Sequence, residues 1–361
     1  MNKLVEIVES TRYYDGLTLP KRMVECRTPA VSIALVESFE ITDTYTHGVR
    51  RRGKGNTVAA DTIFQAASIS KPVFAAAVMR LVERSVLDLD RDVADYLADF
   101  SLPTFDNQHH KITLRQLLSH HGGLNLGGFN GYHPGQKIPT VDQILRGAHP
   151  ANHIILKIET APEAGFSYSG GGYMLAQKIV TEVCKADFCD LLDELVLFPL
   201  AMARSTFAQP LPVEKRENAA YGYNDYNLQL PGGSNIMPEL AAAGLWSTPT
   251  DLARFGIEIM RALKGESDFL SQKSAEMMTT PAYEGSPYGV GFSNPKSGRG
   301  PTFGHGGTNV GFHSHMGFCP ADGTGMVVMQ NSDIGSSIRG EVANAFCDVY
   351  DWWPLAERRW G

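Results

Sequence analysis

Cysteine is scarce in this sequence, and its distribution argues against a disulfide framework. Five cysteines occur among 361 residues, and none forms a CxxC pair. An odd number of scattered cysteines fits reduced thiols in a cytoplasmic protein better than a set of disulfides. We expect Cys319 and Cys347 to be small core residues.

A long apolar run and a targeting signal are also missing. No stretch approaches the ~18 uninterrupted apolar residues of a membrane span. At the amino terminus, Glu6 and Glu9 interrupt the chain before an apolar signal region can develop. We expect a cytoplasmic protein without a membrane partner.

Positive charge does not dominate either. Lys and Arg number 32 against 39 Asp and Glu, a net charge of −7. The short basic cluster at residues 50–54 is predicted to be a solvated hairpin tip, which argues against nucleic acid as a partner. Phosphate-binding glycine patterns such as GxGxxG are missing as well.

What is present is enough apolar sequence for one large core or two fused lobes: 43% hydrophobic residues and 20% charged ones. Apolar and β-branched runs predict strands in both terminal parts, and residues 71–256 are predicted to be mainly helical. The strands are expected at 30–37, 40–49, 288–292, 302–304, 312–318 and 325–330, and terminal helices at 2–14 and 338–350.

Strands at both ends of a chain with helices between them predict an α/β (α+β) fold with one antiparallel sheet built from both termini. Residues 1–80 and 276–361 would form the sheet lobe, and residues 81–275 a mostly helical lobe. Sites tend to occupy such clefts, so we expect the active site between the lobes.

A first chemical motif is Ser68-x-x-Lys71 within residues 64–72. Residues three apart share a helix face, so the Lys71 amine can reach the Ser68 hydroxyl and activate it as a nucleophile. The apolar pattern that follows Pro72 predicts a buried helix. A second copy of the spacing, at Ser293 and Lys296, lies in a Pro/Gly-rich loop, and we interpret it as coincidence.

A second motif places Tyr168 on a loop before a helical run that begins near Met174. A tyrosine there can act as a general acid or base if a nearby ammonium lowers its pKa. Taken alone, this motif favours a turn tyrosine whose ring packs and whose hydroxyl is hydrated.

The third motif is the run His305, Gly306, Gly307 and Thr308 on a predicted strand. Glycines there let substrate approach the backbone, whose N–H groups can face an oxyanion. A metal site formed by His305, His313 and His315 is the competing hypothesis, although the carboxylate ligands of common metallohydrolase motifs are missing. The pairs at 109–110 and 120–121 are interpreted as loop and capping histidines.

In this order, the three motifs resemble the serine β-lactamase and penicillin-binding superfamily, most closely its class C β-lactamases and related esterases. Two connecting segments are similar as well: residues 112–124 (ITLRQLLSHHGGL) and 242–253 (AAGLWSTPTDLA). The similarity spans roughly residues 25–335.

This resemblance implies that Ser68 attacks a carbonyl while Lys71 and Tyr168 handle its proton. The backbone N–H groups of Ser68 and Thr308 would form the oxyanion hole. Such an enzyme requires neither a metal nor an organic cofactor.

Two departures from the family pattern bear on the substrate. Gly170 stands where lactamases usually have an asparagine, and His305-Gly306-Gly307 replaces the usual Lys-Thr-Gly, which removes a cation and a hydroxyl that bind carboxylate. We therefore expect a carboxylic ester or a small amide as substrate. The alternatives left open are a D,D-peptidase or D-aminopeptidase, a weak β-lactamase, an acyltransferase, the metallohydrolase and a catalytically silent binding module.

Overall fold

The computed structural model describes residues 2–297 and 300–352. Its main sheet has six strands in the order β3-β2-β1-β10-β9-β8, all antiparallel. The amino-terminal part of the chain supplies β1 (Ala30–Glu37), β2 (Glu40–Arg51) and β3 (Asn56–Thr57). The carboxyl-terminal part supplies β8 (Phe303–Asn309), β9 (Phe312–Cys319) and β10 (Thr324–Gln330). The prediction of one sheet assembled from both ends of the chain is therefore confirmed.

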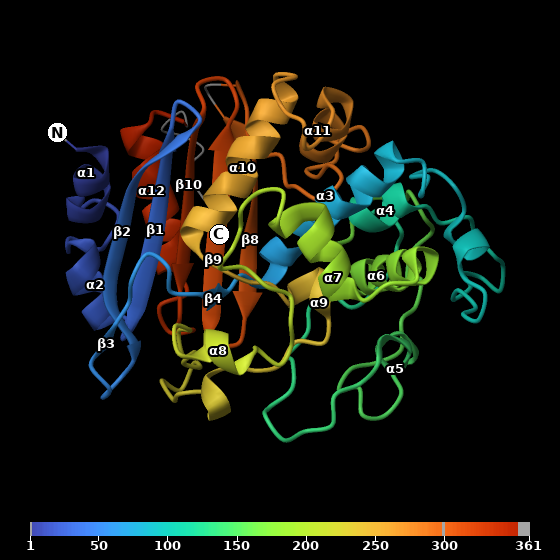
Figure 1. Cartoon of the computed structure of the whole chain (residues 1–361), viewed down its shortest axis with the longest axis horizontal. Helices are drawn as coiled ribbons and strands as arrows, with labels where there is room; N and C mark the ends of the chain where they lie inside the picture. The colour runs from blue at the N-terminus through green and yellow to red at the C-terminus, as the bar shows by residue number, and fades with distance from the viewer. Residues whose placement is uncertain (1, 298–299, 353–361) are drawn as a thin grey trace.

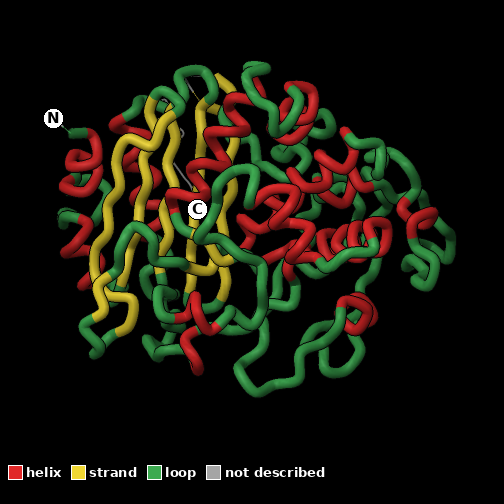
Figure 2. Tube along the Cα trace, in the orientation of Figure 1, coloured by secondary structure: helices red, strands yellow, loops and turns green. Residues whose placement is uncertain are grey.

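Helices cover both faces of this sheet (Figures 1 and 2). On one face, α12 (Ile338–Val349) packs against β9 and β10, and α1 (Lys3–Glu9) packs against α12. On the other face, α10 (Pro249–Leu263) packs against β1, β9 and β10. The division into a sheet lobe (residues 1–80 and 276–361) and a helical lobe (residues 81–275) stays a prediction. Helix α10 lies on the sheet, although this division assigns its residues to the helical lobe.

The middle of the chain forms the helical part at the right of Figure 1. The remaining helical elements are α2 (Leu19–Glu25), η1 (Ala67–Ile69), α3 (Ser70–Glu83), η2 (Val93–Tyr96), α4 (Leu114–Leu118), α5 (Val141–Arg146), α6 (Gly170–Cys184), α7 (Phe188–Leu192), η3 (Asp193–Leu197), α8 (Val213–Arg216), η4 (Pro231–Gly233), α9 (Leu240–Ala243) and α11 (Gln272–Thr279). Short strand pairs join β4 (Phe64–Gln65) to β5 (Trp246–Ser247) and β6 (Lys296–Ser297) to β7 (Gly300–Pro301). Within the described ranges, no helix combines the length and apolarity needed to cross a membrane.

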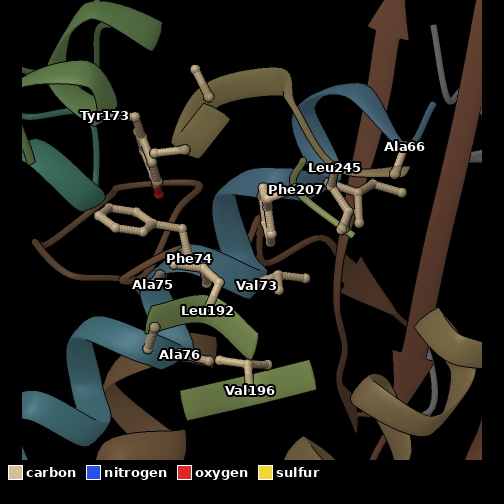
Figure 3. Close-up of a cluster of buried hydrophobic side chains, with 14 of the residues drawn as sticks. Ala66, Val73, Phe74, Ala75, Ala76, Tyr173, Leu192, Val196, Phe207 and Leu245 are labelled. Atoms are coloured by element: carbon tan, nitrogen blue, oxygen red, sulfur yellow. The ribbon is translucent and has the colours of Figure 1, made fainter. Parts of the chain in front are cut away.

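Helix α3 is the centre of the larger core. Its residues from Ser70 to Met79 are buried. Phe74 lies with its ring centroid 6.2 Å from that of Tyr173 on α6 and 5.6 Å from that of Phe188 on α7. Figure 3 shows this packing around Phe74, Tyr173 and Phe207. Burial on all sides makes α3 a rigid base for the motif at its amino-terminal end.

Several predicted elements differ from the structure. The first helix ends at Glu9, because Ser10 is extended. Tyr288 and Ser293 form only an isolated bridge, so the strand expected at 288–292 is wrong; Gly291 has a φ of 106°, which turns the backbone out of a strand. The basic cluster does lie at the hairpin turn between β2 and β3, as predicted, but it is not merely solvated: Arg52 stacks on Tyr223 with 4.4 Å between the guanidinium carbon and the ring centroid. None of the five cysteines, all of them in the described ranges, forms a disulfide, and Cys319 and Cys347 are buried as expected.

Candidate active site

Ser68 lies on the 3₁₀ turn η1, directly before α3. The residue in front of it, Ala67, has a left-handed φ of 51°, a conformation that is unfavourable for alanine. Two buried hydroxyls hold this turn: Ser314 Oγ donates to the Ala66 carbonyl at 2.8 Å, and Ser70 Oγ donates to the Ala67 carbonyl at 2.6 Å. Tertiary contacts from β9 and α3 therefore fix the position of the Ser68 side chain.

Lys71 is buried beneath Ser68. Its Nζ donates to Ser68 Oγ at 3.0 Å and to the Ala242 carbonyl at 2.8 Å. Burial lowers the pKa of the Lys71 amine to about 7. Near neutral pH a large fraction of this amine is therefore uncharged and has a lone pair available for a proton.

Tyr168 ends the loop that leads into α6 and lies against the same pair. Lys71 Nζ lies 4.9 Å from the Tyr168 ring centroid. Burial raises the pKa of the Tyr168 phenol, and a hydrogen bond with the Ser68 side chain opposes that rise. The structure thus brings Ser68, Lys71 and Tyr168 together, although about a hundred residues separate the first two from the third.

Strand β8 forms the opposite wall of the site. It can pack tightly against η1 because Gly307 has no side chain: a Cβ there would lie 2.2 Å from the Ala66 carbonyl oxygen. Thr308 follows on the exposed edge of the sheet and lines the same cavity as Ser68. Close packing at Gly307 therefore sets how near the backbone of Thr308 lies to Ser68.

His305 lies on β8 beside the tyrosine. Its ring centroid is 6.3 Å from that of Tyr168, and its Nδ1–H donates to the Gly306 carbonyl at 2.6 Å. Burial, with a smaller contribution from the Lys71 charge, lowers the pKa of the His305 imidazole to about 3. At neutral pH this position is uncharged, unlike the lysine of the usual motif.

The strand register separates the three histidines of the metal hypothesis. His305 pairs with Met316, whereas Gly306 pairs with His315 and Thr308 pairs with His313. Side chains alternate along a strand, so His313 and His315 lie on the face opposite to His305. In residues 2–297 and 300–352, no group of three or more His, Cys, Asp or Glu side chains can hold a metal ion. His313 pairs instead with Asp333, with 2.8 Å between Nε2 and Oδ1.

The structure explains why position 170 is a glycine, which the sequence alone does not. A Cβ at this position would lie 2.7 Å from Phe129 Cε2 and 3.2 Å from the Leu126 carbonyl oxygen. The ring of Phe129, which lines the cavity, thus occupies the space that a side chain at 170 would need. An aromatic ring replaces a polar amide on this side of the site.

These groups surround one open cavity of about 830 Å³. Its lining joins the loop at 127–130, the edge of β8 and the start of α12, and it includes Ser68, Tyr168, His305 and Gly306. Arg339 on α12 also lines it and donates to the carbonyls of Gly307 and Ser314. A cavity with one guanidinium, the carboxylates of Asp225 and Asp333 and several neutral polar groups can bind a small polar molecule against Ser68.

Sequence reasoning missed two residues near the site. Arg339 belongs to a predicted terminal helix with no recognisable motif, and only the packing of α12 on β9 brings it to the cavity. His120 does lie in the turn that ends α4, as predicted, but the prediction did not include its burial or its place 4.2 Å from Tyr168, measured between ring centroids. Its place inside the segment 112–124, similar to a family segment, was the one signal available.

The chain resembles several curated proteins at low identity. It is 29% identical to esterase EstB of Burkholderia gladioli over 185 residues, which cover 49% of this chain and 46% of EstB. It is 24% identical to penicillin-binding protein 4 of Amycolatopsis lactamdurans over 308 residues, 80% of this chain and 77% of that protein. The match thus spans about half the length of EstB and most of the penicillin-binding protein.

Solved structures show the same fold. The D-amino acid amidase of Ochrobactrum anthropi SV3, complexed with L-phenylalanine amide, superimposes with a TM-score of 0.75 at 23% identity, covering 97% of this chain and 98% of the amidase. The octameric penicillin-binding protein homologue of Pyrococcus abyssi gives a TM-score of 0.74 at 23% identity, covering 94% and 77%. The Beta-lactamase family model matches residues 18–344. The chain therefore belongs to the β-lactamase family, a family of serine hydrolases.

Proposed function

We propose that this protein is a serine hydrolase that cleaves carboxylic esters through an acyl-enzyme formed on Ser68. The observation that carries the proposal is the 3.0 Å contact between buried Lys71 Nζ and the Oγ of Ser68, which lines the cavity. A serine hydroxyl needs a base within hydrogen-bond reach, and a buried amine with a pKa of about 7 is suited to that task at neutral pH.

In the proposed mechanism, neutral Lys71 takes the proton of Ser68 as Oγ attacks the ester carbonyl. The backbone N–H groups of Ser68 and Thr308 stabilise the oxyanion, each contributing ~3 kcal/mol in comparable enzymes. Tyr168, protonated because burial raises its pKa, donates a proton to the leaving alkoxide, and the amine resupplies that proton. A water molecule then attacks the acyl-enzyme and releases the acid.

The preference for esters follows from the groups beside Ser68. His305 is uncharged at neutral pH and Gly306 has no hydroxyl, so the usual carboxylate-binding pair of β-lactam-recognising enzymes is missing from β8. Phe129 replaces the amide expected at position 170. An apolar acyl group fits this wall better than a peptide-like one, and the similarity to a protein named esterase supports the same choice.

A small amide, such as an amino-acid amide, is the second candidate. The Asp225 carboxylate lines the cavity and could pair with a substrate ammonium. The fold is shared with a D-amino acid amidase, which makes this substrate class the natural comparison.

We also propose a cytoplasmic location. The lack of a disulfide among the five cysteines, all of which the structure describes, supports it.

The test compares p-nitrophenyl esters, a chromogenic cephalosporin and D-amino-acid amides, using wild type and Ser68→Ala. We expect short esters to be cleaved fastest and the variant to be inactive and unlabelled by a fluorophosphonate. Equal turnover by both proteins would reject the hydrolase. Activity lost with a chelator and restored by zinc would favour the metallohydrolase, and acyl transfer to an added alcohol in preference to water would indicate an acyltransferase.

A further inference from the structure

His120 follows the short helix α4 and is almost fully buried, with 1% of its surface exposed. Its backbone has a left-handed φ of 62°. A residue with a Cβ pays about 1 kcal/mol or more for this conformation, so neighbouring contacts must hold it there. Part of this hold is the C-terminal turn of α4 itself, where the His120 N–H donates to the Leu117 carbonyl at 3.4 Å and the His121 N–H donates to the Gln116 carbonyl at 2.8 Å. The loop that carries Tyr168 supplies further contacts.

The two neighbours of Tyr168 in the chain are both bonded to His120. The Ser167 N–H donates to the His120 carbonyl at 2.8 Å. The Ser169 N–H donates to His120 Nδ1 at 3.0 Å. The backbone is therefore held on each side of Tyr168 by one residue.

The imidazole also contacts the phenol ring directly. The ring centroids of His120 and Tyr168 are 4.2 Å apart with an interplanar angle of 36°. Lys71 Nζ lies 4.9 Å from the same Tyr168 ring. His120 thus limits both the path of the loop and the tilt of the ring whose hydroxyl bonds with Ser68.

The Ser169 bond requires a neutral imidazole, because Nδ1 accepts the hydrogen bond from the Ser169 N–H with its lone pair and therefore cannot carry a proton. The tautomer is therefore Nε2–H. Burial lowers the pKa of His120 well below its ordinary value, and the Lys71, His305 and His121 charges lower it further. The other titratable groups that face the ring are the phenols of Tyr168, Tyr173 and Tyr288. His120 consequently keeps its acceptor throughout the neutral pH range.

A packing role alone does not account for an imidazole here. His120 Nε2 is buried and has no hydrogen-bond partner among the described residues. A buried polar group without a partner costs roughly 1–3 kcal/mol, so an apolar ring would be the more stable filler. The acceptor at Nδ1 is what an apolar ring could not supply.

We propose that His120 is a positioning residue, which holds the Tyr168 hydroxyl beside Ser68 by binding the backbone on both sides of the tyrosine. The inference rests on the proposed function, because it concerns the same reaction. A displacement of a reacting group by ~1 Å can lower the rate about a hundredfold. Loss of the His120 contacts should therefore lower kcat more than it changes KM.

The test uses two substitutions that separate the acceptor from the ring. In His120→Asn, the side-chain oxygen can replace Nδ1, and asparagine tolerates the left-handed conformation. In His120→Phe, the ring stays but the acceptor is lost. We expect His120→Phe to lower kcat for a p-nitrophenyl ester about 30- to 100-fold with little change in KM, and His120→Asn to keep most of the activity. The reverse order, with Phe active and Asn impaired, would show that His120 only fills space.

A double-mutant cycle tests whether His120 acts through the tyrosine. In a Tyr168→Phe background, His120→Phe should cause no further loss of kcat, because no phenol remains to be positioned. An equal loss in both backgrounds would overturn the proposal. His121→Asn is the matched control: His121 is a buried neighbour whose Nδ1 bonds within its own turn, to the Ser119 carbonyl at 2.7 Å, and kcat should stay near that of wild type.

Hydrogen exchange supplies a measurement that does not depend on turnover. The Ser169 amide should be protected in wild type and in His120→Asn and should exchange faster in His120→Phe, while amides of β9 stay protected in all three. This result would support the positioning role of His120 even if the protein hydrolysed none of the tested esters. In that case only the proposed function would fail. An unchanged exchange rate of the Ser169 amide in His120→Phe would refute the positioning role of His120, whatever the activity.

Discussion

Lys71 donates to the carbonyl oxygen of Ala242 at 2.8 Å. A neutral amine has two N–H bonds and one lone pair, and this bond uses one N–H. That leaves one N–H and the lone pair for Ser68 Oγ, 3.0 Å away, so the amine can donate to Oγ, as it does here, or accept its proton. Helix α9, which is distant in sequence, thereby helps to orient the amine at the nucleophile.

The pKa of Lys71 predicts the acid limb of the pH–rate profile. Because only the uncharged amine accepts a proton, kcat/KM should fall about tenfold per pH unit below pH 7 and level off above it. Ester hydrolysis measured from pH 5 to 9 checks this expectation. Lys71→Arg, which carries a fixed charge, should lose at least about a hundredfold in kcat at every pH. A flat profile across pH 7 would rule out Lys71 as the base.

Gly307 should be intolerant of any side chain. A Cβ there would lie 2.2 Å from the Ala66 carbonyl oxygen and 2.3 Å from Ser314 Oγ, so β8 would have to move away from the turn that carries Ser68. We expect Gly307→Ala to lower the free energy of unfolding by about 1–3 kcal/mol and kcat by more than about tenfold.

Denaturation in urea and ester kinetics measure these two effects. The stability control is Gly306→Ala, where the nearest atoms to a new Cβ are 3.9 Å away, and its free energy of unfolding should stay within about 0.5 kcal/mol of wild type. Equal stability of the two variants would contradict the close packing of β8 on η1.

Gly170 and Phe129 should behave as a coupled pair. Gly170→Asn alone forces the new side chain against the Phe129 ring and should destabilise the protein by about 1–3 kcal/mol. In a Phe129→Ala background the same substitution should cost less, because the ring no longer fills the space. Chemical denaturation of the four proteins gives the coupling energy, and strictly additive effects would show that Phe129 is not the obstacle.

The neutral histidine on β8 should be a determinant of substrate charge. His305→Lys introduces an ammonium beside the cavity, so kcat/KM for a substrate with a carboxylate should rise roughly tenfold relative to an uncharged ester. A chromogenic cephalosporin and p-nitrophenyl acetate, assayed side by side, provide this ratio. His305→Gln, which keeps the position neutral, should leave the ratio as it is in wild type.

Local sequence patterns predicted most of the strands correctly, and they named candidate site residues that the structure brings together. The apolar and β-branched runs of β1 and β10 identified both strands, because these properties depend on neighbours within each strand. The Ser68-x-x-Lys71 spacing predicted a short contact, because three residues of helix bring one side chain to the other. The strand expected at 288–292 failed because its glycines allow a turn that the apolar pattern does not reveal.

The roles of Phe129, Ala242, Arg339 and His120 could not be predicted from local patterns. Each reaches the site from a loop or helix whose sequence carries no catalytic motif, and each contact depends on how distant elements pack. The same holds for the metal hypothesis: the strand register, set by long-range pairing of β8 with β9, decided that His305 faces away from His313 and His315.

By itself, the sequence determined the nucleophile, its amine and its tyrosine as candidates, and the strands that would build the sheet, because residue type and spacing along one element are local properties. Only the tertiary structure decided that Lys71 is buried deeply enough for its pKa to fall to about 7 and that Phe129 takes the space beside Gly170. It also decided that His120 accepts hydrogen bonds from the residues on both sides of Tyr168. Burial and contact between distant segments exist only once the chain has packed, which is why no local pattern encodes them.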